Sequence, residues 1–333
     1  MAFDIECAVH GEKDSPVIAP TYIAGLARAG TTILLQTLCA TGRYTTLTYR
    51  NMPFVMAPRL WSQLSRRSRK SAQAAERAHG DRLKVDYDSP EAFEEVFWMT
   101  ATKRLFVATN KLHPHKVQGP GIVDYRQFVA NVLGVEQKPE GDVAKRYLAK
   151  NNNNLLRLDS IFEAFPDARI VVPFRNPYDH AKSLLAQHAR FSEQHARDSF
   201  SLEYMNWLGH FEFGSNHKPF GFDAASGGDQ NVPLDTIDYW LDYWARIYAH
   251  VASKYAERVF FFDYDSFCQD PNGNLKELAH FLNVDEDVLA VAGSKVEAAT
   301  RYAADDSILP ASVRLVHEQL ISLTKEQQFS GRS

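Results

Sequence analysis

The sequence predicts an α/β fold in which helices cover both faces of a central parallel sheet. The first observation is an apolar, β-rich segment at 17–24 that leads into a glycine-bounded loop and then a helical run at 31–38. This order of strand, loop and helix opens a βαβ unit. The second observation is that further apolar strand segments, at 147–149, 169–174 and 259–262, alternate with segments of helical periodicity. Such alternation is typical of a parallel sheet between two layers of helices.

The chain is expected to form one domain. At 333 residues it could form one large domain or two ordinary ones, and its 45% hydrophobic and 12% aromatic content suffices for a substantial core. No linker, internal repeat or low-complexity tract divides it. We therefore predict a single domain over 1–333, with inserted helical or loop regions at about 50–105 and 190–257.

Charge, cysteine content and hydropathy bear on the partners and the compartment. The net charge of −4 argues against a protein built mainly to coat nucleic acid or an anionic membrane. The three cysteines are widely separated and match neither a disulfide framework nor a metal-ligand pattern. The first 16 residues are acidic and contain no long apolar run, and no later stretch has the length of a membrane span. These features predict a soluble protein of the reducing cytoplasm.

Periodicity and capping residues predict the elements between the strands. Ser89 and Pro90 are expected to start a helix that runs to Trp98, followed by a short strand at 104–108. A long loop is predicted at 210–232, because this stretch is rich in Gly, Asn and Pro. Further helices are predicted in the partly basic insertion at 52–88 and over 155–165, 177–190, 237–251, 275–282 and 313–323.

The segment from Gly25 to Thr32 has the spacing of a phosphate-binding loop. Gly25, Gly30 and Thr32 fit the pattern of Gly, four residues, Gly, Lys, then Ser or Thr, so we predict a three-layer, P-loop-like fold. Glycines let the backbone wrap an anion, and the following helix adds N–H donors and a favourable dipole.

One position of this motif departs from the pattern. Thr31 stands where a lysine is expected, a severe loss for a nucleoside triphosphatase. Arg28 offers a cation from a different angle, so the loop suits a phosphate-bearing ligand with other chemistry. The alternative interpretation is a tight turn from strand to helix that binds no ligand.

A second anion site is predicted at the same edge of the sheet. Arg175 directly follows the strand at 169–174, and Ser183 lies two helical turns along the next helix. Ligands of an open parallel sheet bind beyond the carboxyl ends of its strands. Arg28 and Arg175 should therefore meet at that edge, where an arginine and a helix-borne hydroxyl can hold a second phosphate.

These residues resemble the sulfotransferases that depend on 3′-phosphoadenosine 5′-phosphosulfate (PAPS). The segment 25–32 is similar to their 5′-phosphosulfate loop, in the arginine-containing variant of bacterial members and tyrosylprotein sulfotransferases. Residues 165–177 with Ser183 resemble their 3′-phosphate segment, and residues 264–282 resemble a late strand–helix signature. The resemblance spans 17–285, although the insertions match less clearly.

The resemblance implies a reaction and a set of donor contacts. The implied reaction is in-line transfer of the sulfuryl group of PAPS to an acceptor hydroxyl, on a carbohydrate or small metabolite, without a metal. Lys150, which ends a strand 25 residues before Arg175, would stabilise charge on the leaving phosphate, with Arg28 as a second catalytic cation. The implied donor-binding residues are Arg28, Ala29, Gly30, Thr31, Thr32, Arg175 and Ser183.

The general base does not follow from either family pattern. Sulfuryl transfer to a hydroxyl needs a proton acceptor near the acceptor oxygen, commonly His or Glu. Asn152 stands where cytosolic members have their histidine, and residues 48–50 (Thr-Tyr-Arg) stand where the tyrosylprotein branch has a glutamate. The chain departs from both patterns, so neither base can be transferred to it.

Other side chains are candidates for this role. Glu95 and His113 are predicted as possible bases, although each also has an ordinary structural interpretation. His210 and Glu212 lie in the predicted loop that could cover the acceptor pocket. Rival bases are Glu94, Asp86 and His115.

Two other functions stay open at this point. A nucleotide or small-molecule kinase would bind Mg-ATP and show no preference for a 3′-phosphate. The strand at 259–262 followed by Asp263 mimics the Mg²⁺-binding strand of ATPases, but Thr31 removes the partner lysine of that arrangement. A non-catalytic nucleotide- or carbohydrate-binding protein would bind its ligand without turnover. No nucleic-acid or membrane partner is expected, and the oligomeric state is open.

Overall fold

The computed structural model of the chain describes residues 1–11, 17–65, 89–135, 145–222, 232–293 and 309–330, with the backbone alone at 75–76, 84–85 and 328–330. Most of the predicted insertion, including its basic run and Asp86, therefore lies outside the described residues. Within them, no helix has the length and apolar character needed to cross a membrane.

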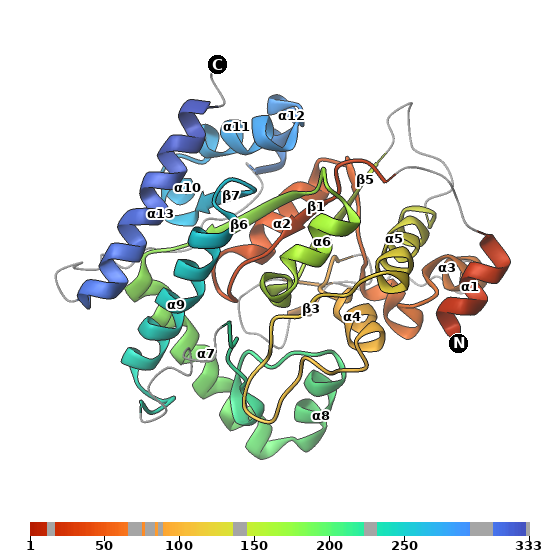
Figure 1. Cartoon of the computed structure of the whole chain (residues 1–333), viewed down its shortest axis with the longest axis horizontal. Coiled ribbons are helices and arrows are strands. Elements are labelled where there is room, and N and C mark those ends of the chain that lie inside the picture. Colours follow the sequence, from red (N-terminus) through yellow and green to blue (C-terminus); the bar gives the residue numbers. More distant parts are fainter. Residues whose placement is uncertain are drawn as a thin grey trace.

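A parallel sheet of five strands forms the centre of the described chain (Figure 1). Its strands are β1 Thr21–Ile23, β2 Tyr44–Thr45, β5 Arg146–Lys150, β6 Arg169–Phe174 and β7 Val259–Asp263. They lie in the order β2-β5-β1-β6-β7, and every neighbouring pair is parallel. In β1, Ile23 is level with Lys150 on one side and Val171 on the other. The carboxyl ends of β5, β1 and β6 therefore meet at one edge.

Helices connect and cover these strands. The described α-helices are α1 Ala2–His10, α2 Thr31–Ala40, α3 Pro58–Ser65, α4 Glu95–Ala101, α5 Pro120–Leu133, α6 Leu158–Ala164, α7 Pro177–Arg197, α8 Ser199–Trp207, α9 Ile237–Tyr255, α10 Tyr264–Gln269, α11 Pro271–Leu282, α12 Glu286–Gly293 and α13 Ala311–Ser330. Short 3₁₀ segments are η1 Tyr49–Phe54, η3 Asn152–Leu156 and η4 Gly214–Asn216, and β3 Ala75–Glu76 pairs with β4 Lys84–Val85 in a small antiparallel ladder.

Alternate side chains of the strands face two separate hydrophobic cores. On one face, Ile23 and Leu148 pack with apolar side chains of α2, α11 and α12. On the other, Tyr22 and Ala149 pack with those of α5, α6, α9 and α13. The residues alternate because successive side chains of a strand point to opposite faces. Figure 1 shows α9 and α13 side by side on one flank of the sheet. The α/β prediction of a parallel sheet between two helical layers is confirmed.

Most of the predicted elements are present, with differences at their ends. The bounds of β6 are as predicted, whereas β1 is shorter than the predicted strand at 17–24. The helices α2, α7, α9, α11 and α13 each extend somewhat beyond their predicted bounds. The described part of the predicted loop at 210–232 contains only the short η4, and α5 was not predicted.

For 89–108 a helix does include Trp98, but its predicted start and the predicted strand are wrong. The helix does not start at Ser89, because this residue and Pro90 pair with the chain around Thr48: the Ser89 carbonyl accepts a hydrogen bond from Tyr49 N at 3.2 Å. α4 begins only at Glu95. The segment 104–108 forms a turn instead of a strand, because Lys103 and Arg104 have left-handed φ values of 51° and 59°.

The prediction for 155–165 is correct only in its second half. The side chain of Asn151 accepts a hydrogen bond from Asn153 N at 2.9 Å and caps η3, so the chain first makes a 3₁₀ turn. The α-helix starts at Leu158. The asparagine run thus does more than end β5, since it shapes the backbone next to Lys150.

Candidate active site

The loop between β1 and α2 contains the glycines of the predicted phosphate-binding motif. Gly30 is the N-cap of α2 and has a φ of 87°, a left-handed conformation that favours glycine. A Cβ atom at Gly30 would lie 2.3 Å from the ring of Tyr264, and one at Gly25 would lie 3.0 Å from Pro173. Neither position has room for a side chain, so the loop packs directly against β6 and α10.

The amino end of α2 supplies backbone donors at this loop. The N–H groups of a first helical turn have no acceptor within the helix, and the helix dipole favours an anion there. The amides of Gly30, Thr31 and Thr32 belong to this turn, whereas Ala29 N donates to Leu26 O at 3.3 Å. Thr31 occupies the usual position of the P-loop lysine. Its side chain is buried and carries no charge, so this position provides no cation.

Three predicted phosphate ligands meet beside the loop. Arg28 Nε donates a hydrogen bond to Ser183 Oγ at 3.2 Å, although the two residues are 155 positions apart. Arg175 Nη1 lies 3.4 Å from the Arg28 carbonyl oxygen. Arg28 has a φ of 70°, a strained conformation for a residue with a side chain. Two guanidinium groups and one hydroxyl therefore gather at the carboxyl edge of β1 and β6, as expected for an anion site.

The surroundings of Arg175 orient its guanidinium group without satisfying it. The group lies over the Tyr264 ring, 5.5 Å from its centroid, and Nε is 3.8 Å from Asp265 Oδ1. The other carboxylate oxygen of Asp265 accepts a hydrogen bond from Asn176 N at 2.5 Å. Nε of Arg175 is buried and has no hydrogen-bond partner among the described residues. Such an orphaned donor fits an anionic ligand that brings its own acceptor oxygens.

Lys150 ends β5 at the same edge of the sheet. It is level with Ile23, and the next residue, Asn151, donates its N–H to Ile23 O at 3.2 Å. Lys150 is only 8% exposed, unusual for a lysine on a strand end. The pairing register therefore places it one strand away from the loop that starts after β1.

His180 supports the loop between β1 and α2, a role that sequence reasoning missed. Its Nε2 lies 2.8 Å from the Ala27 carbonyl oxygen, and its Nδ1 accepts a hydrogen bond from Trp244 Nε1 at 3.1 Å. Because Nδ1 is an acceptor, Nε2 carries the proton and donates it to the loop. Complete burial, the largest effect, lowers the pKa of His180 to about 3, so the ring stays neutral. Only its position five residues after Arg175 could have indicated this role.

Glu95 is placed in a buried ion pair. Its Oε2 contacts Arg157 Nη2 and accepts a hydrogen bond from Asn151 Nδ2 at 2.7 Å. Glu95 and Arg157 are each 1% exposed, and Arg157 also lies over the ring of Trp98. This placement favours a structural role, and we do not retain Glu95 as a base. The rival Glu94 is likewise buried, and it accepts hydrogen bonds from Trp98, Tyr125 and Tyr147.

His113 is exposed at the surface of the loop that follows α4. Its N–H donates to Phe106 O at 2.8 Å, and within the described residues no hydrogen bond links its side chain to the phosphate-binding loop or to Lys150. The neighbouring His115 stacks on Phe106, and burial lowers its pKa to about 3. The structure therefore does not bring either histidine together with Arg28, Arg175 and Ser183.

A polar group next to Lys150 was not predicted as a unit. Asn152 Nδ2 donates to Glu212 Oε1 at 2.9 Å, and His210 Nδ1 lies 3.5 Å from the same oxygen. Burial opposes ionisation of both side chains, but their mutual attraction prevails. It raises the pKa of His210 above its ordinary value and lowers that of Glu212 to about 2. The sequence contained two separate signals, the position of Asn152 in place of a family histidine and the predicted loop that contains His210 and Glu212, but nothing in it joined them.

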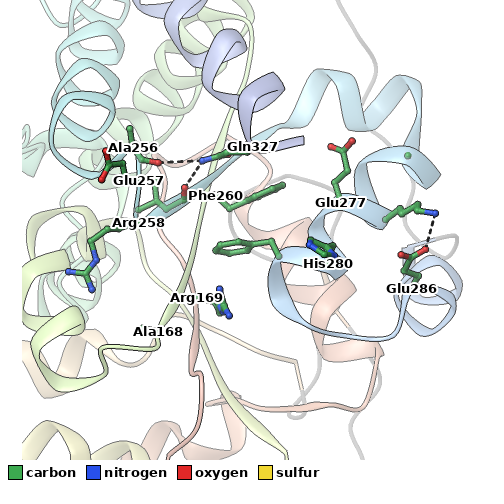
Figure 2. Close-up of a pocket in the computed structure, with 14 residues that line it drawn as sticks. Ala168, Arg169, Ala256, Glu257, Arg258, Phe260, Glu277, His280, Glu286 and Gln327 are labelled. Carbon is green, nitrogen blue, oxygen red and sulfur yellow. Dashed lines mark hydrogen bonds and ion pairs between the residues drawn. The ribbon is translucent and has the colours of Figure 1, made fainter. Parts of the chain in front are cut away.

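A cavity of about 700 Å³ lies at the opposite edge of the sheet (Figure 2). It is lined by Arg169 and Val259, the first residues of β6 and β7, and by side chains of α11 such as His280. Arg169 lies over the ring of Phe281, 5.4 Å from its centroid, and that ring stacks on Phe260. Figure 2 shows Arg169 and Phe260 in the lining. The size of this cavity does not make it the active site. The candidate anion-binding group of Arg28, Arg175 and Ser183 lies at the carboxyl ends of the strands, where ligands of parallel sheets bind. Within the described residues, no cluster of three or more His, Cys, Asp or Glu could hold a metal ion.

Comparisons with known proteins agree with the fold described above. Residues 20–287 match the profile of the Sulfotransferase family. Among solved structures, sulfotransferase STF1 from Mycobacterium tuberculosis H37Rv is similar at 17% identity and a TM-score of 0.52, covering 96% of this chain and 81% of that one. Sulfotransferase STF9 from Mycobacterium avium is similar at 12% identity and a TM-score of 0.53, covering 98% and 81%. A comparison with curated protein sequences finds no significant match.

The family match extends from the residue before β1 to beyond α11, and so includes the phosphate-binding loop, Lys150, Arg175 and Ser183. The similar structures share the fold over nearly the whole chain. Enzymes of this family generally take PAPS as the sulfuryl donor. The chain is therefore a member of the sulfotransferase family, and its reaction is the transfer of a sulfuryl group to an acceptor.

Proposed function

We propose that this enzyme binds PAPS at the carboxyl edge of β1, β5 and β6 and transfers its sulfuryl group to a hydroxyl acceptor. The observation that carries the proposal is the cluster of Arg28, Ser183 and Arg175 beside the amino end of α2. The orphaned Nε of Arg175 adds a buried donor that an anionic ligand can satisfy. A kinase is not favoured, because Thr31 removes the cation that γ-phosphoryl transfer requires.

In this proposal the donor is held at its two charged ends. Arg28 and the amides of Gly30, Thr31 and Thr32 hold the 5′-phosphosulfate, whereas Arg175 and Ser183 hold the 3′-phosphate. Ala29 is not included, because its N–H already donates a hydrogen bond to the Leu26 carbonyl oxygen. Because ATP lacks a 3′-phosphate, the second site selects PAPS over ATP by charge-assisted hydrogen bonds.

The transfer step follows from the chemistry of the donor. The acceptor oxygen attacks sulfur in line, the bond between sulfur and the 5′-phosphate oxygen breaks, and 3′-phosphoadenosine 5′-phosphate (PAP) leaves with the electron pair. Lys150, buried at the end of β5, neutralises the charge that develops on the leaving oxygen. The acceptor hydroxyl must lose a proton to a base.

Calorimetry with PAP and ADP tests the donor assignment. We expect tighter binding of PAP, and a loss of PAP affinity of about 10- to 100-fold in Arg175→Ala, because a charged hydrogen bond contributes about 1.5–3 kcal/mol. Arg169→Ala is the matched control, since it removes an exposed arginine from the other end of the same strand. Equal affinity for PAP and ADP, or an Arg175→Ala variant that binds like the control, would contradict the proposal.

The acceptor class is proposed more coarsely. Resemblance to bacterial members favours a hydroxyl on a carbohydrate or a small metabolite. Transfer of label from [³⁵S]PAPS to a panel of sugars, phenols and alkyl alcohols would identify the class.

The proposed compartment is the reducing cytoplasm. The three cysteines are free thiols in the structure, as expected for a protein of that compartment.

A further inference from the structure

The loop from Gly209 to Phe213 is anchored beside the end of β5. Asn153 Nδ2 donates to Gly209 O at 3.2 Å, and Asn152 Nδ2 donates to Glu212 Oε1 at 2.9 Å. Both asparagines belong to η3, which begins two residues after Lys150. The loop around residue 210 therefore lies beside the end of β5, although it is about 60 residues away in the sequence.

The close approach of this loop depends on a glycine. Gly209 has a left-handed φ of 75°, and a Cβ atom there would lie 2.5 Å from both Glu95 Cγ and Met99 Sδ. The loop therefore packs directly against the side chain of Glu95, which is held by its ion pair with Arg157. Glu95 acts as a positioning residue for the groups above it.

His210 is oriented by Glu212 in the manner of a histidine with a carboxylate partner. Nδ1 faces Glu212 Oε1 at 3.5 Å, which leaves Nε2 as the ring nitrogen that can accept a proton. Both side chains are partly exposed, at 23% for His210 and 15% for Glu212, so a substrate can reach them. The carboxylate holds the imidazole in one tautomer and stabilises the imidazolium that forms on protonation.

Charged groups on three elements act electrostatically on this imidazole. Glu212 lies on the same loop, Lys150 lies on β5, and Glu91 lies just before α4. The two carboxylates favour the protonated ring, whereas Lys150 disfavours it. Glu91 itself accepts a hydrogen bond from Tyr49 OH at 3.0 Å. The hydrogen bond to Glu212 from Asn152, two residues after Lys150, holds this loop beside the end of β5, where we assign Lys150 to the leaving oxygen.

We propose that His210 is the general base of the reaction and that Glu212 positions it, an inference that rests on the proposed function. Nε2 takes the proton of the acceptor hydroxyl as that oxygen bonds to sulfur and PAP departs. The proton stays on the imidazole and then passes to solvent. Asn152, which stands in the place of the family histidine, holds Glu212 and so connects the relocated base to the end of β5.

The test uses the full-length enzyme and needs no identified acceptor. The probe is PAPS labelled with ³⁵S, with water as the acceptor hydroxyl and release of labelled sulfate as the readout, and PAP binding is measured in parallel by calorimetry. For His210→Gln we expect a fall in rate of about 10²-fold or more, typical of the loss of a general base, with PAP affinity within about twofold. His250→Gln, on the far part of α9 where the ring stacks on Phe222, is the matched control. Thermal melting checks that every variant is folded.

Glu212→Gln gives a readout that a purely structural role would not move. Removal of the carboxylate should lower the pKa of His210, so the acid limb of the rate profile should move to lower pH. Titration of the histidine ring by NMR should show the same shift in the PAP complex. An unchanged limb and an unchanged ring titration would overturn the role of Glu212.

The remaining outcomes separate this inference from the function on which it rests. If His210→Gln keeps the wild-type rate while PAP binds normally, His210 is not the base and the donor assignment stands. A large loss in His113→Gln with none in His210→Gln would transfer the role to His113. If the wild-type enzyme binds no PAP, the proposed function and this inference both fail.

Discussion

The donor end and the acceptor end of this site are built in different ways. The proposed donor end is built on one continuous segment, β1, its loop and α2, to which Arg175 after β6 and Ser183 of α7 are added. The acceptor end combines side chains of η3, the loop at 209–213 and the segment before α4, which are far apart in the sequence. Local backbone geometry and the order of the strands in the sheet determine the first, whereas packing between distant loops determines the second. Substitutions should therefore affect the two ends differently.

The largest effect is expected at the ion pair of Glu95 and Arg157, which packs against the loop of the proposed acceptor end. Glu95→Ala leaves the guanidinium of Arg157 buried without its partner, which should lower the free energy of unfolding by about 3–5 kcal/mol. Urea unfolding of the variant measures this loss. Glu163→Ala breaks an exposed pair with Lys116 and is the control, with a much smaller loss expected because exposed ion pairs contribute little to stability. Equal losses in the two variants would show that the buried pair has no special structural role.

The next effect separates chemistry from binding. Lys150→Ala should lower turnover by about 10²- to 10³-fold, because a group that stabilises developing charge acts in the transition state. PAP affinity should change far less. Lys276→Ala, at the opposite edge of the sheet, is the control. A loss of PAP affinity as large as the loss of turnover would assign Lys150 to the donor end as a binding residue.

A smaller effect is expected beneath the donor loop. His180→Phe removes the hydrogen bonds to Ala27 O and from Trp244, but keeps an aromatic ring of similar size. Loss of these buried bonds should lower the free energy of unfolding by about 1–3 kcal/mol and weaken PAP binding by about tenfold. Calorimetry and urea unfolding measure the two changes. Wild-type values for both would show that the loop holds its shape without His180.

His180 also makes the donor end sensitive to acid. Its folded-state pKa of about 3 lies below the ordinary 6.5, so the unfolded chain binds the proton more readily. The contribution of His180 to stability is therefore complete above pH 6.5 and is lost progressively as the pH falls toward 3. In His180→Phe, stability should fall less steeply over this range, and an identical pH dependence would contradict this account.

The smallest effect is expected at the hydroxyl of the donor end. Ser183→Ala removes one neutral donor from the proposed 3′-phosphate site and also removes the acceptor of the hydrogen bond from Arg28 Nε. PAP affinity should fall by about tenfold or less, since one hydrogen bond contributes about 0.5–1.5 kcal/mol. A loss greater than that of Arg175→Ala would reverse the proposed order of the two ligands.

Prediction from sequence was accurate where local signals agree. The strand at 169–174 was found with its bounds because an apolar run is followed by Asn176 and Pro177, whose side chain and ring start α7. The helix predicted from Ser89 failed because backbone pairing with residues 47–49 overrides its capping residues. Local propensity is a weak prior when tertiary contacts offer the backbone another partner.

The same limit explains the candidate site. Residue order was enough to predict an anion site, because a glycine-bounded loop between strand and helix must present its amides at the carboxyl edge of a parallel sheet. The ion pair of Glu95 with Arg157, the support of Ala27 by His180 and the group of Asn152, Glu212 and His210 emerged only from the tertiary structure. Each joins side chains that are 60 or more positions apart or that look ordinary in the sequence, and no local spacing rule links them. Burial then decides their charge states, because desolvation and neighbouring charges act only once the chain has folded.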